Sequence, residues 1–313
     1  MAAEPRVGVV VINWHARDAT VVCLQALQGL VYRNWVLVLI DNDCDDFCAD
    51  EVRALVPGAR YLRTDANLGF AGGSNLGMRQ ALADGADYVW FLNNDAAPEP
   101  QALDELIRVA QTDSRIAVVG AKILLGDHQQ RLDSVALDVN LRWGRVYLRG
   151  HDEVDVGQYD TLTDTAAVSG CAMLVGRAAC ERLGGFDERY FAYLEDADLC
   201  SRARAAGFRV MAAPRARVAH HRAAATSNRQ SVASLYYAAR NHLLLVERHG
   251  SGTALHRRLR RCFVAALNYA YALRSGKGRL ARLQAVRRGV QDYHRGITGG
   301  SWKEDAAGSR PHR

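Results

Sequence analysis

The stretch YVWFLNND at Tyr88–Asp95 joins a short apolar run to three polar residues. An apolar run of this length, rich in aromatic and aliphatic residues, is typical of a strand buried on both faces of a parallel sheet. Two earlier stretches share the pattern: VGVVVIN at Val7–Asn13, and the strand Trp35–Ile40, which is followed by Asp41. The sequence therefore predicts several buried parallel strands that each end in a polar side chain.

Helical patterns alternate with these strands over the first 120 residues. This alternation predicts an α/β fold with a mostly parallel central sheet and helices on both faces. In such sheets ligands bind beyond the carboxyl ends of the strands, where Asn13, Asp41 and Asp95 fall. The expected helices are Asp18–Leu30, Ala49–Leu55, Gly72–Asp84 and Glu99–Gln111, and further strands are expected at Arg60–Leu62 and Ile116–Ile123.

The second half of the chain is less regular. Residues 126–165 are more polar, and we expect an irregular insertion there with a hairpin near Leu141–Leu148. From residue 231 onward the pattern is helical. The predicted elements are strands at Val168–Val175 and Phe208–Ala212, a helix ending at Leu183, and helices at Glu195–Ala206, Ser231–Arg248, Ala254–Arg274 and Gly278–Arg295.

The composition limits the class of protein. Of the 313 residues, 49% are hydrophobic and 6 are proline, which excludes disorder over most of the chain. No apolar run reaches the roughly 18 residues of a membrane-spanning helix, and the first residues lack the pattern of a secretory signal. The 7 cysteines form no repeating frame, so we expect reduced thiols and a cytoplasmic protein.

Charge is divided unequally along the chain. Residues 240–313 contain 16 Lys and Arg against 4 Asp and Glu, a net charge of +12, whereas residues 1–239 carry a net charge of −6. A basic helical region on an acidic body suggests contact with an anionic surface, either membrane lipid or nucleic acid. The alternative is a solvated basic face.

Two motifs could bind a nucleotide. A carboxylate at Asn93-Asn94-Asp95 can hold a hard divalent cation, which would also bind the oxygens of a diphosphate. The glycine-rich turn LGFAGGSN at 68–75 leads into a helix N-terminus, where backbone N–H groups favour phosphate. It matches neither the dinucleotide GxGxxG motif nor a P-loop. Taken singly, both motifs are equally consistent with a turn or a helix cap.

Two further groups could carry proton transfer and metal binding. Glu195-Asp196-Ala197-Asp198 places three carboxylates at a helix start, where they either cap the helix or leave one carboxylate with the raised pKa of a general base. The pair His220-His221 follows a strand and could complete a metal site that begins at Asp95. A surface position is the alternative for both histidines.

Together these motifs resemble the GT-A glycosyltransferases of family 2 over roughly residues 7–245. The GT-A fold implied is the mostly parallel sheet with helices on both faces, extended here by a C-terminal helical region. The glycine-rich and NNDA versions are similar to the branch that contains rhamnosyltransferases and galactofuranosyltransferases. The motifs are VVVINW (9–14), LIDND (39–43), NLGFAGGSNLG (67–77), FLNNDA (91–96), VSGCAMLVGR (168–177), LGGFDERYFAYLEDADLCSRARAAGF (183–208) and the late histidines.

The resemblance implies a role for each motif residue. Asp41 would bind the pyrimidine base of a nucleotide sugar, Asp95 and His220 would hold Mg²⁺ or Mn²⁺ with His221 as the alternative ligand, and Asp196 would be the catalytic base. Asn93 stands where the family commonly has an Asp, which removes one charge. Glu195 and Asp198 would orient the acceptor or cap the helix, and Trp143 could stack on a sugar. The other residues expected to line the nucleotide are Asn13, Asn67, Gly69, Phe70, Gly72, Gly73, Asn75, Asn93 and Asn94.

The implied activity is metal-dependent, inverting transfer of a sugar to a glycan or a polyprenyl-linked acceptor in surface polysaccharide synthesis. The branch favours dTDP-L-rhamnose as donor, with UDP-galactofuranose or another UDP-hexose, on an acceptor such as a small molecule, as the alternative. Residues 1–230 would form the catalytic domain, with a nucleotide-sugar half over about 1–123 and an acceptor half over 124–230. Residues 231–298 would be the basic helical region, and 299–313 a disordered tail.

Other readings of the sequence remain. The basic helices suit either the membrane interface, on the inner face of the cell membrane, or a homodimer interface. A nucleic-acid-binding protein is disfavoured because the chain has no recognisable RRM, KH, zinc-finger or helix-turn-helix motif and has an acidic body. Nucleotidyl transfer normally needs a glycine-rich N-terminal loop with Arg or Lys, which VVVINWHARD does not offer. A non-enzymatic sugar binder is disfavoured by the intact set of Asp95, Asp196 and His220.

Overall fold

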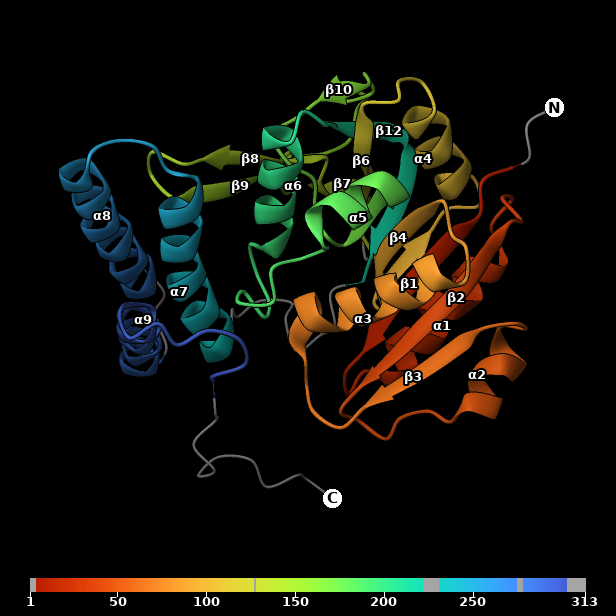
Figure 1. The fold of residues 1–313 in the computed structure, drawn as a ribbon, viewed down its shortest axis with the longest axis horizontal. Coiled ribbons are helices and arrows are strands. Elements are labelled where there is room, and N and C mark those ends of the chain that lie inside the picture. The colour runs from red at the N-terminus through yellow and green to blue at the C-terminus, as the bar shows by residue number, and fades with distance from the viewer. Residues whose placement is uncertain (1–3, 127, 222–230, 275–277, 303–313) are drawn as a thin grey trace.

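The computed structural model describes residues 4–126, 128–221, 231–274 and 278–302. A ten-stranded mixed sheet runs through the first two ranges in the order β10-β12-β6-β11-β4-β1-β2-β3, with β5 paired to β12 and β7 to β6 (Figure 1). Strands β8 and β9 form a separate two-stranded sheet. The strands of both sheets are β1 (Val7–Asn13), β2 (Trp35–Asn42), β3 (Arg60–Thr64), β4 (Tyr88–Asn93), β5 (Ala96–Pro98), β6 (Ile116–Leu125), β7 (His128–Ser134), β8 (Ala136–Asn140), β9 (Arg145–Arg149), β10 (Thr163–Asp164), β11 (Ala172–Gly176) and β12 (Arg209–His220).

The sheet is parallel where the apolar runs predict it. Strands β3, β2, β1 and β4 are parallel neighbours, and β6 runs parallel to β12. Strand β11 separates the two parallel groups and pairs antiparallel with both β4 and β6. The carboxyl ends of β1, β2 and β4 therefore meet at one edge, because parallel strands in register end together.

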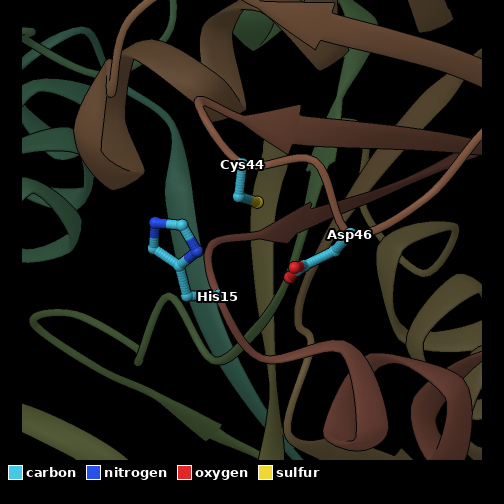
Figure 2. Close-up of side chains that lie close together, drawn as sticks. All are labelled: His15, Cys44 and Asp46. Carbon is cyan, nitrogen blue, oxygen red and sulfur yellow. The ribbon is translucent and has the colours of Figure 1, made fainter. Parts of the chain in front are cut away.

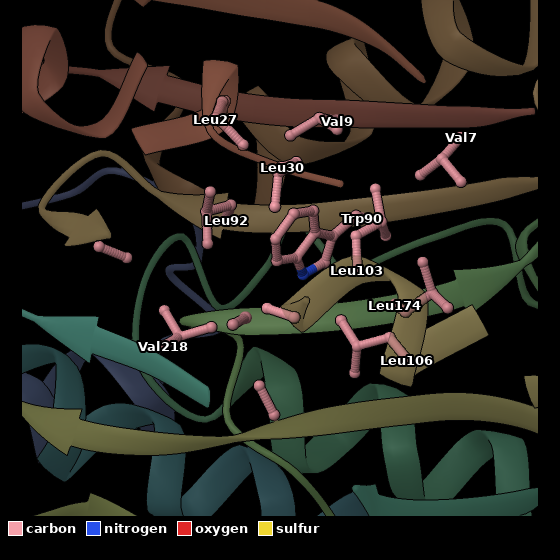
Figure 3. Close-up of a cluster of buried hydrophobic side chains, with 14 of the residues drawn as sticks. Val7, Val9, Leu27, Leu30, Trp90, Leu92, Leu103, Leu106, Leu174 and Val218 are labelled. Carbon is pink, nitrogen blue, oxygen red and sulfur yellow. The ribbon is translucent and has the colours of Figure 1, made fainter. Parts of the chain in front are cut away.

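Helices cover both faces, as the strand and helix alternation predicts. Helices α1, α2 and α4 bury one apolar face around Trp90, which is fully buried in the core (Figure 3). Helices α3, α5 and α6 cover the opposite face around Phe91 and Phe186. The helices are α1 (Arg17–Gln28), α2 (Ala49–Leu55), α3 (Gly69–Ala83), α4 (Ala102–Ala110), α5 (Arg177–Leu183), α6 (Glu195–Ala205), α7 (Val232–His249), α8 (Ala254–Leu273) and α9 (Arg279–His294).

The last three helices form a separate bundle beside the sheet (Figure 1). Their bounds lie within a residue or so of the predicted ones, since capping residues and glycines mark the ends. The Ser231 and Thr253 side chains accept hydrogen bonds from the first turns of α7 and α8. No helix in the described ranges is both long and apolar enough to cross a membrane.

Three stretches differ from the sequence-based expectation. The expected irregular insertion contains regular strands: β7 extends the main sheet, and β8 and β9 form the hairpin, which begins earlier than expected. Strand β11 starts at Ala172 rather than Val168, and β12 runs on to His220 because an irregularity between Ala213 and Arg217 carries the strand past Pro214. Within the expected tail, residues 299–302 pack against α7, while 303–313 lie outside the described residues.

Candidate functional site

The polar ends of β1, β2 and β4 lie side by side at one edge of the sheet. Asn13 is paired in register with Asp41, and Asn93 stands beside Ile12 on the other side of β1. Strand β12 brings a further group to this edge, since His220 pairs with Ala96 directly after Asp95. Residues separated by more than 200 positions in sequence thus border one region.

Asp41 lies at the centre of a closed hydrogen-bond network. Its carboxylate accepts hydrogen bonds from the Tyr61 hydroxyl at 2.8 Å, the Cys44 thiol at 2.7 Å and the Asn13 amide at 3.3 Å. Burial and then the hydrogen bond to Asp41 raise the pKa of Cys44 to about 12, so the thiol keeps the proton that it donates. Asp41 itself is fully buried, so the pyrimidine base of a nucleotide could reach its carboxylate only if this network rearranged.

Asn13 and Asn94 are tied together through α1. The Thr20 hydroxyl donates to the Asn13 side-chain oxygen at 2.8 Å and accepts from the Asn94 amide at 2.9 Å. This relay fixes the ends of β1 and β4 relative to each other. Both asparagines therefore shape the edge of the sheet, whatever they contact in a bound ligand.

A second group near the same edge could accept a cation. His15, Cys44 and Asp46 each offer one ligand atom, and these atoms lie within 4.8 Å of one another (Figure 2). The Asn13 amide already donates to Cys44 Sγ at 3.2 Å and to Asp46 at 2.9 Å. The Asn13 amide thus already occupies two of the three groups, and the Cys44 thiol would have to lose its proton to bind a cation.

The glycine-rich turn is held by two asparagines. The Asn67 side-chain oxygen accepts from the Gly69 N–H at 2.8 Å and from the Asn42 amide at 3.0 Å. Gly69 has φ +67°, and a Cβ there would lie 2.5 Å from the Phe191 ring. The backbone N–H of Ala71 donates to the Phe191 carbonyl at 3.0 Å. The turn is therefore closed on one side by the loop around Phe191.

Four residues expected to line the nucleotide have packing roles in the structure. Gly73 lets α3 approach β1, since a Cβ there would stand 3.1 Å from Ile12. At Gly72, a Cβ would stand 2.9 Å from the side chain of Leu68, which directly precedes α3. The buried side chain of Asn75 bonds both the N–H and the carbonyl of Phe186, at 2.8 and 2.9 Å, and Phe70 packs edge-on against the Phe186 ring. Sequence alone cannot separate a glycine needed for helix packing from one needed for a ligand.

Asp95 and His220 face each other, and a third residue orients the histidine. His220 Nε2 lies 3.1 Å from Asp95, and Nδ1 lies 2.7 Å from the carboxylate of Asp133 in β7. Burial lowers the pKa of His220, but the hydrogen bonds to Asp133 and Asp95 outweigh it and raise the pKa to about 9. His221 contributes its backbone N–H, which donates to the Asp95 carbonyl.

This arrangement has the chemistry of a metal site. A histidine that binds a metal through one ring nitrogen commonly donates its other N–H to a carboxylate, which fixes the ring and its tautomer. Asp95 offers the hard oxygen ligand that Mg²⁺ and Mn²⁺ prefer. Asp133 was not predicted because it lies in the polar insertion, where no local motif distinguishes it from other surface acids.

Asp196 lies at the start of α6 and points at the backbone of residue 170. Its carboxylate accepts from the Gly170 N–H at 3.0 Å and from the Ala197 N–H at 2.7 Å. The next residue, Cys171, accepts the Asn93 N–H at 2.9 Å, so Gly170 and Cys171 connect Asp196 to the end of β4. Asp196 is half-buried and remains open on one side.

Glu195 and Asp196 are in unlike surroundings. Glu195 is buried, and its Oε2 atom has no hydrogen-bond partner among the described residues. Burial and then the Asp196 charge raise the pKa of Glu195 well above its ordinary value. Burial also raises the pKa of Asp196, but two backbone N–H groups favour its charged form. A proton shared by this pair therefore belongs on Glu195, and Asp196 carries the charge.

Asp198 and Trp143, both expected to contact the acceptor, contact the helical bundle in the structure. Asp198 is fully buried on the far side of α6, where it pairs with Arg202 and His249 at 2.7 Å each and ties α6 to α7. In this structure Asp198 is held between α6 and α7, and its expected role, to orient the acceptor or to cap the helix, stays a prediction. Trp143 lies at the tip of the β8–β9 hairpin and packs on Phe263 of α8, with ring centroids 4.9 Å apart. The hairpin thus uses Trp143 to contact the helical bundle.

Two buried residues of α7 hold the loop that precedes Asp196. The Asn241 amide donates to the carbonyls of Tyr190, Ala192 and Tyr193 at 2.8–2.9 Å. The Arg240 guanidinium donates to the carbonyls of Arg189 and Tyr190 at 3.0 and 2.9 Å. We call these two residues the α7 clamp. They were not predicted, because only the tertiary fold brings α7 to this loop.

The clamped loop has an unusual backbone. Phe191, Tyr193 and Leu194 all have φ between 64° and 72°, a region that residues with a side chain rarely adopt. Each such residue costs on the order of 1–3 kcal/mol and persists only where surrounding contacts hold it. The α7 clamp supplies those contacts directly before the helix that carries Asp196.

Comparisons with known proteins agree with this geometry. A sequence profile described as "Glycosyltransferase like family 2" matches residues 5–236. An N-acetylglucosaminyl-diphospho-decaprenol L-rhamnosyltransferase of Mycobacterium tuberculosis is 28% identical over 243 residues, covering 72% of this chain and 79% of the relative. The galactofuranosyltransferase GlfT1 of Mycolicibacterium smegmatis is 35% identical over 142 residues, covering 44% of this chain and 45% of the relative.

A solved structure supports the same fold. The mannosyltransferase PcManGT from Pyrobaculum calidifontis, in complex with GDP-Man and Mn²⁺, is similar to this chain with a TM-score of 0.57. The similarity covers 95% of this chain and 84% of that protein at 18% sequence identity, so it concerns the fold alone.

Proposed function

The chain belongs to the family 2 glycosyltransferases and has their GT-A fold, and from this premise we propose that it transfers L-rhamnose from dTDP-L-rhamnose to a lipid-linked glycan with inversion at the anomeric carbon. The rhamnosyltransferase relative, which is similar along most of both chains, supports the choice of sugar. Its name specifies a decaprenyl-diphosphate acceptor, which supports a lipid-linked acceptor here.

One observation carries the proposal. The carboxylates of Asp95 and Asp196 border the same edge of the sheet, one paired with a carboxylate-oriented histidine and the other held by the Gly170 N–H. Sugar transfer from a nucleotide diphosphate needs two functions: stabilisation of a diphosphate leaving group, and a base for the acceptor hydroxyl. This edge offers residues for both.

Asp95 and His220 are the residues that would hold a divalent cation. Their donor set fits Mg²⁺ or Mn²⁺, because Asp95 offers a carboxylate oxygen and Asp133 keeps His220 Nε2 directed at it. When bound, such a cation stabilises the negative charge that develops on the diphosphate. Asn93 adds no charge at this site, so Asp95 supplies the anionic ligand at the end of β4.

Asp196 would act as the general base. It accepts the proton of the acceptor hydroxyl while that oxygen forms its bond to the anomeric carbon, and the bond from this carbon to the diphosphate oxygen breaks. The dTDP leaves with the bonding electrons, and a single displacement inverts the configuration. The Gly170 and Ala197 N–H groups hold the carboxylate in place and favour its charged form.

A second donor deserves a parallel test. The GlfT1 relative has the higher sequence identity, 35%, over the shorter aligned region. This relation favours UDP-galactofuranose as the alternative donor. Epimeric and ring-form differences between sugars are read by contacts spread over several loops, so the fold does not choose between the two donors.

The proposal is tested by assaying purified protein with dTDP-L-rhamnose and with UDP-galactofuranose, using a polyprenyl-diphosphate-linked N-acetylglucosamine acceptor. We expect Mn²⁺-dependent transfer of rhamnose, with a product whose anomeric configuration, read by NMR, is opposite to that of the donor. Transfer of galactofuranose alone would replace the donor assignment and keep the mechanism. A product with retained configuration would refute Asp196 as the base of a single displacement.

A further inference from the structure

Helix α8 presents an apolar stripe on the side that faces away from the rest of the protein. Its members recur every three or four residues and so share one face of the helix. Leu255 and Leu259 are 65% and 58% exposed, and the opposite face of α8 buries Val264. In Figure 1, α8 stands at the outer edge of the molecule. The apolar stripe consists of Leu255, Leu259, Cys262, Ala266, Ala270 and Leu273, all exposed.

Basic residues flank the apolar stripe. Arg258 lies on one side of it, and His256 and Arg274 lie on the other; all three are exposed. Neither Arg258 nor Arg274 pairs with a carboxylate in the described parts of the chain. Helix α8 contains no Asp or Glu along its 20 residues. The stripe is therefore bordered by the cations Arg258 and Arg274, which no carboxylate on the helix neutralises.

We propose that α8 lies flat on an anionic lipid bilayer, with the apolar stripe in the headgroup region and the flanking cations on lipid phosphates. A helix of 20 residues is about 30 Å long, and it lies in the interface rather than across it because arginines interrupt its apolar surface. Each Lys or Arg near an anionic surface contributes about 1 kcal/mol. The net charge of +12 over residues 240–313 matches such a surface.

Charge argues against a second copy of the chain as the occupant. Two copies related by a two-fold axis would bring the same patch together, so the arginines that flank one stripe would meet those of the other. Because α8 has no carboxylate to pair with them, that contact would be repulsive at its borders. A surface of lipid phosphates has the opposite charge.

The bundle connects this surface to the candidate active site. Leu243 and Val246 of α7 pack with Val264 of α8, while Arg240 and Asn241 of the same helix hold the loop before Asp196. A bilayer at α8 would therefore lie in a fixed position relative to Asp196. A lipid-linked acceptor held in that bilayer would then reach Asp196 from a defined direction. This consequence rests on the proposed function, whereas vesicle binding itself is measured without donor or acceptor.

The test is cosedimentation of the full-length protein with vesicles of phosphatidylcholine alone and of phosphatidylcholine mixed with phosphatidylglycerol. We expect binding to the mixed vesicles that weakens at high salt. The double variant Leu255→Ser/Leu259→Ser should bind about tenfold more weakly or worse, since two exposed leucines no longer enter the interface. Arg258→Glu/Arg274→Glu should weaken binding by a similar factor.

The matched control is Val22→Ser/Val31→Ser, which removes two apolar side chains that are 50% and 51% exposed on the opposite part of the molecule. It should bind vesicles as the unchanged protein does, and circular dichroism should show the same helix content in all variants. Equal binding of the control and the leucine variant, or no binding to anionic vesicles, would overturn the proposal. So would a dimer, seen by light scattering without lipid, that the leucine variant dissociates.

Discussion

At the scale of the residue, the adjacent carboxylates Glu195 and Asp196 have different protonation because they meet different surroundings. Glu195 is buried without a partner for Oε2 among the described residues, whereas Asp196 accepts two backbone N–H groups. Separating the pKa values of neighbouring groups is a common way to obtain one charged base at neutral pH. Asp196 is therefore the charged member of the pair.

Asp196→Asn should abolish most of the activity and keep the fold. The amide is the same size and its oxygen can still accept the Gly170 N–H, but it cannot take a proton. We expect kcat to fall by about 10²–10⁴ while the donor KM changes little. Initial rates of sugar transfer measure the change, and Asp84→Asn, at a carboxylate paired with Arg60 at the C-terminal end of α3, serves as the control. A variant that keeps near-normal kcat would remove Asp196 from the mechanism.

The pH dependence of activity should follow from the raised pKa of Asp196. Burial raises this pKa, so the base becomes protonated at a higher pH than an exposed aspartate, whose pKa is about 3.9. Activity needs the charged form and is therefore lost as the pH falls through the raised pKa. The acidic limb of log kcat/KM against pH should lie above the ordinary aspartate range. A profile that stays flat down to that range would contradict the assignment.

Asp133→Asn should weaken metal binding although Asp133 is not itself a proposed ligand. Its carboxylate accepts the His220 Nδ1–H at 2.7 Å and so directs Nε2 at Asp95. Loss of such a partner typically lowers metal affinity about 10–100-fold. Calorimetric titration with Mn²⁺ measures the affinity, and Asp152→Asn, an exposed carboxylate of the same insertion, is the control. Unchanged affinity for Mn²⁺ in Asp133→Asn would argue against this positioning role.

Candidate site residues can be picked out of the sequence only where a local motif marks them. The motif residues Asp95 and His220 come at the end of strands, and Asp196 begins a helix, and each of these elements can be recognised from its sequence pattern. Asp133 and Asn241 act on residues far away in sequence, so only the fold reveals them. The burial of Asp198 could not be predicted, because a helix start rich in carboxylates does not show which of them faces the protein interior.

At the scale of the element, the loop at 189–194 links the candidate active site to the helical bundle. Its backbone has three left-handed residues with side chains, and its carbonyls are held by Arg240 and Asn241. The loop ends where α6 begins, so its conformation sets the position of Asp196. The helical bundle thus helps to position Asp196, although none of the residues proposed as catalytic lies in it.

Asn241→Ala should reduce both stability and turnover. It leaves the carbonyls of Tyr190, Ala192 and Tyr193 without the amide donor, and a buried unsatisfied group costs about 1–3 kcal/mol. We expect the free energy of unfolding to fall by about 2–3 kcal/mol and kcat to fall more than the donor KM changes.

Urea unfolding and steady-state kinetics measure the two effects. Asn34→Ala, which removes an asparagine with one contact to the backbone of Glu4, is the control for both. A variant that loses stability with unchanged kcat would make the clamp purely structural and would separate it from the position of Asp196.

Whole elements were easier to predict than their contacts. The strands that end at Asn13 and Asn93 and the three C-terminal helices have clear apolar periods and, for two of the helices, capping residues. The polar insertion was expected to be irregular, yet β7 joins the main sheet by pairing with β6. Its polar sequence hides the strand because alternation there is weak, and pairing with a buried neighbour decides the structure.

At the scale of the whole molecule, the chain joins an acidic catalytic body to a basic bundle. The net charges of −6 and +12 are visible in the sequence, and the fold places the basic helices on one side of the sheet domain. The alternation of strands and helices predicted a mostly parallel sheet with helices on both faces, and the resemblance to family 2 glycosyltransferases implied the GT-A fold; both predictions are confirmed. How the bundle packs on the loop before α6 could not be predicted, because no local pattern encodes that contact.

The central claim is that the edge of the sheet binds a nucleotide sugar through a cation held at Asp95. The most direct test is calorimetric titration of the purified protein with dTDP and UDP, each with Mn²⁺ and with EDTA, alongside Asp95→Ala and Asp196→Asn. We predict Mn²⁺-dependent binding, tighter for dTDP, that Asp95→Ala abolishes and Asp196→Asn retains. Binding that ignores both Mn²⁺ and Asp95, or no binding of either nucleotide, would contradict the account.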